Sequence, residues 1–368
     1  MRVLMISKAC LVGAYQTKLE EIGKSKDIEL MVLVPPSWND PAGRIDLERR
    51  HTDGYSLVAD PIRFNGNYHL HYYPSLKKRL ESFGPNIVHI DEEPYNLATW
   101  LAWRQARAKG AKTLFFSWQN IEKRYPFPFS ALESQVLAGT NYAVFGNQDA
   151  AKVWQNKGYA GPYKVIPQFG VDPEFFAPVL KRDDGRGFVI GSANRRLVYE
   201  KGVDLLLRAA ADLPGIWRLH VAGEGPEKAR LQQLAQELGI AHQVYFDGAI
   251  SSAQMPDYLR QMDALVLSSR TLPGWKEQFG RVLIEAMSCT VPVVGSDSGE
   301  IPNVVGPAGL LFPEGDIGAL RAHLLELMQS PQRRQELGRL GRERVLQQFT
   351  QTQVAARTVD VYHEMVAF

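Results

Sequence analysis

Residues 277–287 read Glu-Gln-Phe-Gly-Arg-Val-Leu-Ile-Glu-Ala-Met, and this stretch decides how the second half of the chain is interpreted. Its apolar residues, 282–284 and 286–287, predict a buried helix that begins near Gly280. Glu285 stands among them, where an ionised carboxylate is costly unless it is hydrogen-bonded. The first backbone N–H groups of a helix have no intrahelical acceptor and favour an anion. Glu277 precedes that helix start and Glu285 follows it. The stretch therefore predicts a phosphate site with a carboxylate on either side, each able to bind hydroxyl groups. A sugar nucleotide has this combination of groups.

A second charged group lies at Arg195–Gly202, between a predicted strand and a predicted helix. In parallel α/β sheets, ligands bind at the carboxyl ends of the strands. Arg196 and Lys201 are therefore candidates to neutralise a diphosphate by charge-assisted hydrogen bonds. The alternative is a solvated loop of surface cations, and this group taken alone favours that alternative.

Composition narrows the class of protein. The chain has 368 residues, of which 45% are hydrophobic and 22% charged, and this favours two globular domains. A net charge of +2 does not favour a nucleic-acid partner. Cys10 and Cys289 are isolated and suggest a reducing compartment. Since the start of the chain reads as a strand rather than a signal peptide, and no apolar run has the roughly 18 residues that span a bilayer, we expect a cytoplasmic protein.

Short apolar strands alternate with amphipathic helices from end to end, which predicts parallel sheets in an α/β protein. The Pro-, Gly- and charge-rich segment Ala177–Gly187 is the best linker candidate. We therefore expect an N-terminal domain at residues 1–176 and a second domain at 188–350, with ligand in a cleft between them. Residues 351–368 are expected to form a helix that packs back on the first domain. The region from Ser37 to Tyr73 lacks clear periodicity and predicts a hairpin or long loops.

Candidates in the first half are individually weaker. Gly13 lies in the first strand-to-helix turn, where it allows close approach of a ligand or simply makes a turn. Glu92 belongs to an acidic group at a predicted strand end, which either contacts an acceptor or is solvated. The aromatic segment Tyr125–Phe129 is either an acceptor wall or a hydrophobic anchor.

Two negative observations limit the chemistry. Gly223-Glu224-Gly225 follows a strand, but Lys228 stands where a dinucleotide fingerprint needs a small residue, and this weakens a dehydrogenase. No Asp-x-Asp pair occurs in the sequence. We therefore expect no metal and no cofactor, and expect cations and a helix terminus to stabilise a diphosphate.

An ordered set of motifs in the second half is similar to the retaining glycosyltransferases of family 4. The resemblance implies the GT-B fold of two facing Rossmann-like domains, while the first half matches in outline only. The residues that carry it are Arg196-Leu197, Lys201-Gly202, Gly223-Glu224-Gly225-Pro226, Phe246-Asp247-Gly248, Glu277–Met287, Pro292-Val293-Val294 and Ala308-Gly309-Leu310.

The resemblance also implies roles for particular residues. Glu277, Arg196 and Lys201 would form the catalytic group, in which Arg196 and Lys201 bind the donor diphosphate and Glu277 binds the donor sugar. Glu285 would bind the nucleotide ribose. The remaining donor contacts would come from Gly13, Phe279, Gly280, Arg281 and Val282.

One departure from the family pattern concerns the acceptor side. A family histidine usually follows the strand that corresponds to Thr113–Ser117, and here Trp118 or Gln119 takes its place. Together with Glu92, these two residues are the acceptor-side candidates.

The implied activity is a metal-independent hexosyl transfer from a nucleotide-diphosphate sugar to a hydroxyl, with retention of the anomeric configuration. The acceptor is a small molecule, a lipid or a saccharide, and peripheral membrane contact is possible. Two alternatives are a nucleotide-sugar epimerase of the same architecture and a non-catalytic nucleotide-sugar-binding subunit.

Overall fold

The computed structural model describes residues 1–41, 43–179, 185 and 187–367. By its internal contacts the chain divides into unit 1, Met1–Gly170 with Gln351–Phe368, and unit 2, Val171–Thr350. The division precedes the expected linker, because the Val171 N–H donates to the Phe349 carbonyl and Phe176 is buried in the core of unit 2. Of that expected linker, residues 180–184 and 186 lie outside the described residues.

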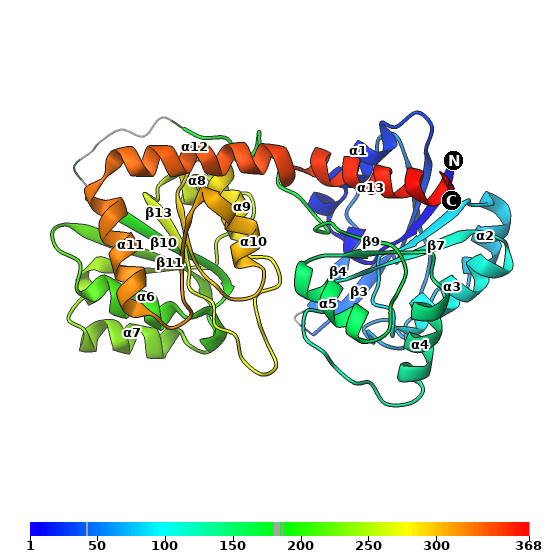
Figure 1. The fold of residues 1–368 in the computed structure, drawn as a ribbon, viewed down its shortest axis with the longest axis horizontal. Helices are drawn as coiled ribbons and strands as arrows, with labels where there is room; N and C mark the ends of the chain where they lie inside the picture. Colours follow the sequence, from blue (N-terminus) through cyan, green and yellow to red (C-terminus); the bar gives the residue numbers. More distant parts are fainter. Residues whose placement is uncertain (42, 180–184, 186, 368) are drawn as a thin grey trace. The chain divides into compact units, whose positions relative to one another are not determined.

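Unit 1 is built on a parallel sheet of strand order β5-β2-β1-β6-β7-β8-β9 (Figure 1). The chain leaves β1 in one direction to reach β2 and β5, and then in the other to reach β6 to β9. This is the order of a doubly wound nucleotide-binding sheet, with its switch point between β1 and β6. The strands are β1 (Arg2–Ile6), β2 (Glu29–Val34), β5 (Ser56–Ala59), β6 (Ile87–Ile90), β7 (Lys112–Ser117), β8 (Tyr142–Phe145) and β9 (Tyr163–Val165).

Both faces of this sheet are covered, because successive side chains of a strand point to opposite faces. Leu4 and Ile6 of β1 enter one core, while Val3 and Met5 enter the other. The second core also contains buried residues of the C-terminal helix, which is why that helix belongs to unit 1. The helices of unit 1 are α1 (Thr17–Gly23), α2 (Leu76–Phe83), α3 (Leu97–Ala108), α4 (Phe129–Gly139), α5 (Gln148–Asn156) and α13 (Gln351–Ala367).

The region between β2 and α2 contains the expected hairpin. Strands β3 (Ser37–Asp40) and β4 (Gly43–Asp46) pair antiparallel. The same region also supplies β5, which pairs in parallel with β2 and was not predicted. Strand β5 has only four residues, and none of them is fully buried, so its sequence carries little hydrophobic signal.

Unit 2 repeats the doubly wound order, β12-β11-β10-β13-β14-β15, again with parallel pairing throughout. Its switch point lies between β10 and β13. The strands are β10 (Phe188–Arg196), β11 (Trp217–Glu224), β12 (Val244–Gly248), β13 (Ala264–Leu267), β14 (Val293–Ser296) and β15 (Leu310–Phe312).

The sheet of unit 2 is also covered on both faces. Ile190 and Val266 face one core, to which α6, α7 and α11 contribute, while Val189 and Leu265 face the other, to which α8, α9, α10 and α12 contribute. The helices are α6 (Val203–Ala211), α7 (Lys228–Glu237), α8 (Met255–Arg260), α9 (Arg281–Ser288), α10 (Ile301–Val305), α11 (Ile317–Gln329) and α12 (Pro331–Gln348).

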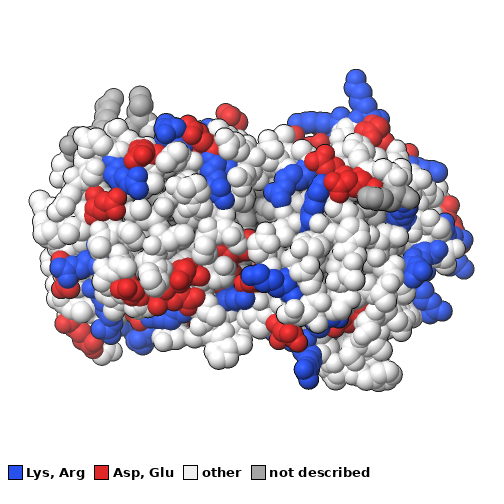
Figure 2. Space-filling model, in the orientation of Figure 1, with Lys and Arg blue, Asp and Glu red and all other residues white. Residues whose placement is uncertain are grey.

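Acidic and basic side chains are intermixed over the visible face of the molecule (Figure 2), as the net charge of +2 leads one to expect. Among the residues that the structure describes, no helix is both long enough and apolar enough to cross a membrane.

Candidate functional site

The segments that follow β10 and β13 meet at the switch point of unit 2. In open parallel sheets, the crevice at such a point is where ligands bind. The first segment leads from Arg196 through the short 3-10 helix Tyr199–Lys201 to α6, and the second leads from Ser268 to α9. These two segments carry most of the residues that the sequence selected.

Lys201 and Glu277 are in direct contact. The Lys201 Nζ lies 2.6 Å from Glu277 Oε2, and the Ser269 hydroxyl donates to the same oxygen at 2.8 Å. The side chains of Lys201 and Glu277 are 20% and 10% exposed, so the pair can still be reached from solvent. Lys201 Nζ also lies 5.0 Å from the centre of the Trp275 ring, in cation–π range.

The backbone around Glu277 is fixed by the turn before α10. The Glu300 N–H donates to the Glu277 carbonyl at 3.1 Å, and Gly299 has a φ of +55°. A Cβ at position 299 would lie 2.0 Å from the Glu277 carbonyl oxygen. Only glycine fits this approach, which holds Glu277 in place.

Residues Ser268 to Arg270 hold the two segments together, and the sequence analysis missed them. Ser268 donates its hydroxyl to the Gly202 carbonyl at 2.8 Å. The Arg270 N–H donates to the Glu200 carbonyl at 2.7 Å, and its guanidinium donates to both Asp204 carboxylate oxygens at 2.8 and 2.7 Å. These residues directly follow a buried strand, but their partners lie far away in the sequence, so the sequence does not reveal the contacts.

Arg196 ends β10 with an exposed side chain. Within the described part of the chain, its guanidinium forms no ion pair. Arg196 is therefore a cation on the segment that carries Lys201, and no contact among the described residues joins it to Glu277.

Helix α9 begins at Arg281, as the sequence predicts within one residue. Gly280 precedes it with a φ of +76°, a left-handed conformation that favours glycine. Val282 is half-buried against the core, and so is Phe279, whose ring lies 5.9 Å from that of Phe349. Phe279 therefore anchors the start of the helix by packing.

Glu285 is buried one turn into α9 and has a partner. The Arg281 Nε lies 2.8 Å from Glu285 Oε1. Burial raises the pKa of the Glu285 carboxyl, and the charge of Arg281 opposes that shift. This ion pair accounts for the carboxylate in an apolar helix without requiring a ligand.

Gly13 lies after β1 in unit 1, at the switch point of that sheet. Its N–H donates to Glu48 Oε2 at 2.9 Å, and Glu48 also pairs with Arg50 at 3.1 Å. A Cβ at position 13 would lie 2.7 Å from Arg50 and from Glu48. The glycine lets the Arg50 and Glu48 side chains pack against this turn. The Glu48 carboxylate accepts the Gly13 N–H, which was expected to face an anion of the ligand.

Glu92 is neither solvated nor open to an acceptor. Its side chain is 1% exposed and pairs with Lys8, and the His71 Nε2 lies 3.7 Å from its other oxygen. Burial alone would raise the pKa of Glu92, but Lys8 and His71 hold it at about 2. The sequence offered two interpretations of Glu92, an acceptor contact and a solvated strand end, and both need correction. The buried carboxylate pairs with Lys8, and so it joins the end of β6 to the end of β1.

Trp118 and Gln119 follow β7 in the place predicted. The Trp118 Nε1–H donates to Gln168 Oε1 at 2.9 Å, and its ring packs so closely on Gly146 that a Cβ there would lie 2.1 Å from it. Gln119 is buried, and its Oε1 accepts from the Tyr125 hydroxyl at 2.9 Å. The two residues therefore shape the carboxyl edge of unit 1, while the other predicted site residues except Gly13 and Glu92 belong to unit 2.

Glu93 belongs to the same acidic group at the end of a predicted strand as Glu92 and lies at this edge as well. Its carboxylate accepts from the Ser117 hydroxyl at 2.5 Å and from the Trp118 N–H at 2.9 Å. Burial raises the pKa of Glu93 to about 7, against the effect of these two hydrogen bonds. The carboxyl thus orients the Trp118 loop and titrates near neutral pH.

This gives a prediction for stability against pH. The folded pKa of Glu93 exceeds the unfolded value of about 4.3, so its stabilising contribution is full below about pH 4.3 and is lost as pH rises to about 7. Across this pH range, we expect the free energy of unfolding of the wild-type protein to fall by roughly 1–3 kcal/mol more than that of Glu93→Gln. Urea unfolding of both proteins at about pH 5 and about pH 8 measures it. A constant difference between the two proteins would contradict the assignment.

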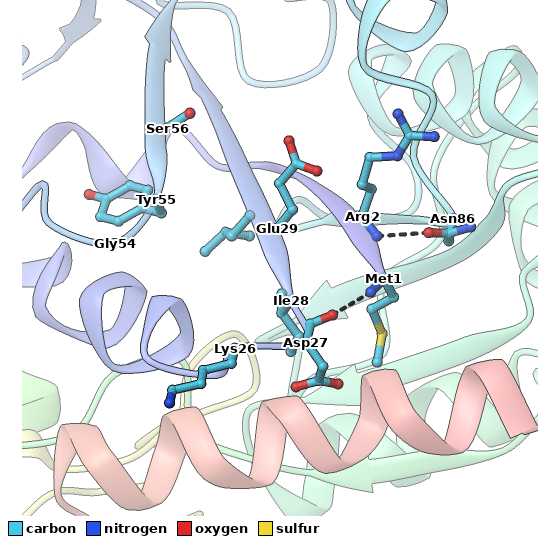
Figure 3. Close-up of a pocket in the computed structure, with 11 residues that line it drawn as sticks. Met1, Arg2, Lys26, Asp27, Ile28, Glu29, Gly54, Tyr55, Ser56 and Asn86 are labelled. Atoms are coloured by element: carbon cyan, nitrogen blue, oxygen red, sulfur yellow. Dashed lines mark hydrogen bonds between the residues drawn. The ribbon is translucent and has the colours of Figure 1, made fainter.

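A hollow of about 720 Å³ lies elsewhere in unit 1 (Figure 3). Its lining includes Arg2, Glu29 and Ser56, which begin β1, β2 and β5. The Arg2 N–H donates to Asn86 there at 2.7 Å. This is the amino edge of a parallel sheet, opposite the edge where such sheets bind ligands, so we do not assign the site to it.

Comparison with known proteins identifies the family of the chain. The family model described as Glycosyl transferases group 1 matches residues 179–344. A GDP-mannose-dependent monoacylated α-(1-6)-phosphatidylinositol monomannoside mannosyltransferase of Corynebacterium glutamicum is 30% identical over 353 residues, covering 91% of this chain and 90% of the relative. An MMP α-(1→4)-mannosyltransferase of Mycolicibacterium hassiacum is 33% identical over 208 residues, and the match spans 55% of this chain and about half, 48%, of that protein.

Solved structures share the fold. HepE of Anabaena, determined in complex with UDP, superposes with a TM-score of 0.75 at 17% identity and covers 99% of this chain and 100% of its own. The two doubly wound units and the returning helix α13 are thus a GT-B fold.

Proposed function

The chain belongs to the family of group 1 glycosyl transferases, the family 4 type, and from this we propose that it moves a sugar from a nucleotide-diphosphate sugar to an acceptor hydroxyl. We propose further that the transfer retains the anomeric configuration and needs no metal. The observation that carries this proposal is the Lys201–Glu277 pair at the switch point of unit 2, braced by Ser269.

The pair supplies the two kinds of contact that such a donor needs. The Lys201 ammonium is a donor for diphosphate oxygens, which gain negative charge as the glycosidic bond breaks. The Glu277 carboxylate is an acceptor for sugar hydroxyls, and its fixed backbone makes it a positioning group. The contribution of these residues would be charge stabilisation and orientation rather than nucleophilic attack.

The other predicted residues support the same proposal. Arg196 is an exposed cation on the segment that carries Lys201 and would add to the charge that faces the diphosphate. The start of α9 at Arg281 would add backbone N–H groups. Glu285, next to that start, would take the ribose hydroxyls in exchange for part of its contact with Arg281. The relatives' names point to GDP or UDP as the nucleotide.

A donor screen tests the proposal. We expect GDP or UDP to raise the melting temperature, and the matching sugar nucleotide to do so as well. Incubation with that donor and a panel of hydroxyl acceptors should then give a product whose anomeric proton coupling in NMR matches that of the donor. Excess EDTA should leave the rate unchanged.

Each other outcome identifies a different function. An inverted anomer would contradict retention, and loss of rate in EDTA that Mg²⁺ or Mn²⁺ restores would contradict metal independence. A new sugar nucleotide formed without acceptor would indicate an epimerase. Binding without turnover of any donor would indicate a non-catalytic subunit.

A further inference from the structure

Trp275 stands on a short turn of unit 2, between the strand β13 and the helix α9. Leu272 and Trp275 pair through reciprocal backbone hydrogen bonds of 2.7 and 3.1 Å, which close a two-residue turn at Pro273-Gly274. Among the residues of unit 2 that the structure describes, the Trp275 side chain is half-buried and packs into neither hydrophobic core. Core packing therefore does not explain this large ring, and aromatic side chains outside the core commonly line ligand sites.

The start of this turn is anchored to two other loops of unit 2. The Thr271 N–H and the Thr271 hydroxyl both donate to the Glu314 carboxylate, in the loop after β15. The Thr271 hydroxyl also lies 3.0 Å from the Ser298 hydroxyl, in the loop after β14. The two loops are joined in turn, because the Glu314 N–H donates to Asp297 Oδ1 at 2.8 Å. These contacts fix the place of the turn that carries Trp275.

The Trp275 ring lies against the ammonium of Lys201. Lys201 Nζ is 5.0 Å from the ring centre, within cation–π range, and 2.6 Å from Glu277 Oε2. The backbone of Lys201 is fixed as well, because the Ser268 hydroxyl donates to the Lys201 carbonyl at 3.2 Å and Gly202 follows with a φ of +64°. An ammonium has three N–H donors and no acceptor. Among the described residues, Glu277 alone accepts a hydrogen bond from this ammonium, so donors remain for a ligand.

An aromatic face attracts this ammonium without adding a charge. The face of an indole ring is negative because of its quadrupole, so it attracts a cation although the ring has no net charge. A second carboxylate in the place of Trp275 would also hold Lys201, but it would repel the phosphates of a ligand. The ring also restricts the flexible four-carbon stem of the lysine before a ligand arrives. Less side-chain freedom is then lost on binding, which favours binding.

We propose that Trp275 is a positioning residue of the donor site, whose ring holds the Lys201 ammonium in place for the diphosphate oxygens of a sugar nucleotide. The inference rests on the proposed function, in which Lys201 binds that diphosphate. The effect of Trp275 acts through Lys201 and depends on the aromatic face rather than on the volume of the side chain. It concerns the phosphates of the donor and not its nucleoside.

The test is isothermal titration of the full chain with GDP and with UDP. Trp275→Leu should weaken binding of the nucleoside diphosphate about threefold to tenfold. Trp275→Phe keeps a ring face, and its affinity should lie between those of the wild type and Trp275→Leu. The affinity for the corresponding nucleoside, which has no phosphate, should be the same in all three proteins. In the Lys201→Met background, Trp275→Leu should have little further effect, because the ammonium that the ring holds is gone.

Trp100→Leu is the matched control. The Trp100 ring on α3 of unit 1 lies 5.1 Å from the Arg104 guanidinium, and its replacement should leave the affinity unchanged. Equal affinity of Trp275→Leu and the wild type would overturn the inference. So would a loss of affinity that persists in full in the Lys201→Met background or extends to the nucleoside, since Trp275 would then have a merely structural role. A wild-type protein that binds no nucleoside diphosphate would refute the proposed function, and the inference with it.

Discussion

Glu277→Gln is expected to lower turnover by about 10² to 10³-fold while the affinity for the nucleoside diphosphate stays within about threefold. The substitution keeps the volume of the side chain and removes its charge, so the effect reports on the carboxylate. A single preorganised contact that strengthens in the transition state has about this value in other enzymes. Turnover is measured as release of the nucleoside diphosphate from the donor that the screen identifies, and affinity by isothermal titration.

The control for this variant is Glu326→Gln. Glu326 on α11 forms a surface ion pair with Arg333, and its replacement should change neither the turnover nor the affinity. Intact turnover of Glu277→Gln would remove the catalytic role. Unchanged turnover with a weaker affinity for the donor would instead make Glu277 a uniform binding group.

Much of the fold was predictable because the pattern of strands and helices is regular. Buried parallel strands such as Ala264–Leu267 are short apolar runs, and these are visible in a sequence. Strand β5 was missed because its residues Ser56–Ala59 are only partly buried. The first unit ends at Gly170 rather than 176 because Val171 and Phe176 are core residues, whereas the sequence draws attention to the Pro- and charge-rich segment that follows.

The placement of the candidate site residues was predictable where one motif combines charge with a helix start. Glu277, Gly280 and Glu285 lie on such a motif, and the structure gives each a defined place. Lys201 was selected as a diphosphate ligand, but its contact with Glu277 spans 76 residues of sequence, and spacing alone does not reveal it.

The contacts that Ser269 and Arg270 make around the Lys201–Glu277 pair were not predictable in the same way. Ser269 and Arg270 are polar residues after a strand, which is an ordinary arrangement, and only the fold shows that one bonds Glu277 and the other Asp204. Glu92 illustrates the opposite error. An acidic residue at a strand end looks exposed, whereas Lys8 and His71 come from other parts of the fold to bury it.

Lys201→Met is expected to weaken nucleoside diphosphate binding by between about tenfold and 150-fold, the value of one hydrogen bond from a cation to a charged group. Methionine keeps most of the apolar stem beside Trp275 and removes the ammonium. The single variant also removes the Lys201 charge from beside the largely buried Glu277 carboxylate, which costs stability. The double variant Lys201→Met with Glu277→Gln removes both charges, and we expect it to recover stability while binding stays weak.

The double variant therefore separates the ligand contact from the internal ion pair. If Lys201 acts only by holding Glu277, the double variant binds nucleotide as Glu277→Gln alone does, and the role in diphosphate binding is refuted. If Lys201 binds the diphosphate, its loss weakens binding equally in both backgrounds, and the dependence of affinity on salt becomes shallower. Lys228→Met provides the matched control, because that lysine forms a surface pair with Glu224 at 2.7 Å and should leave both the affinity and its dependence on salt unchanged.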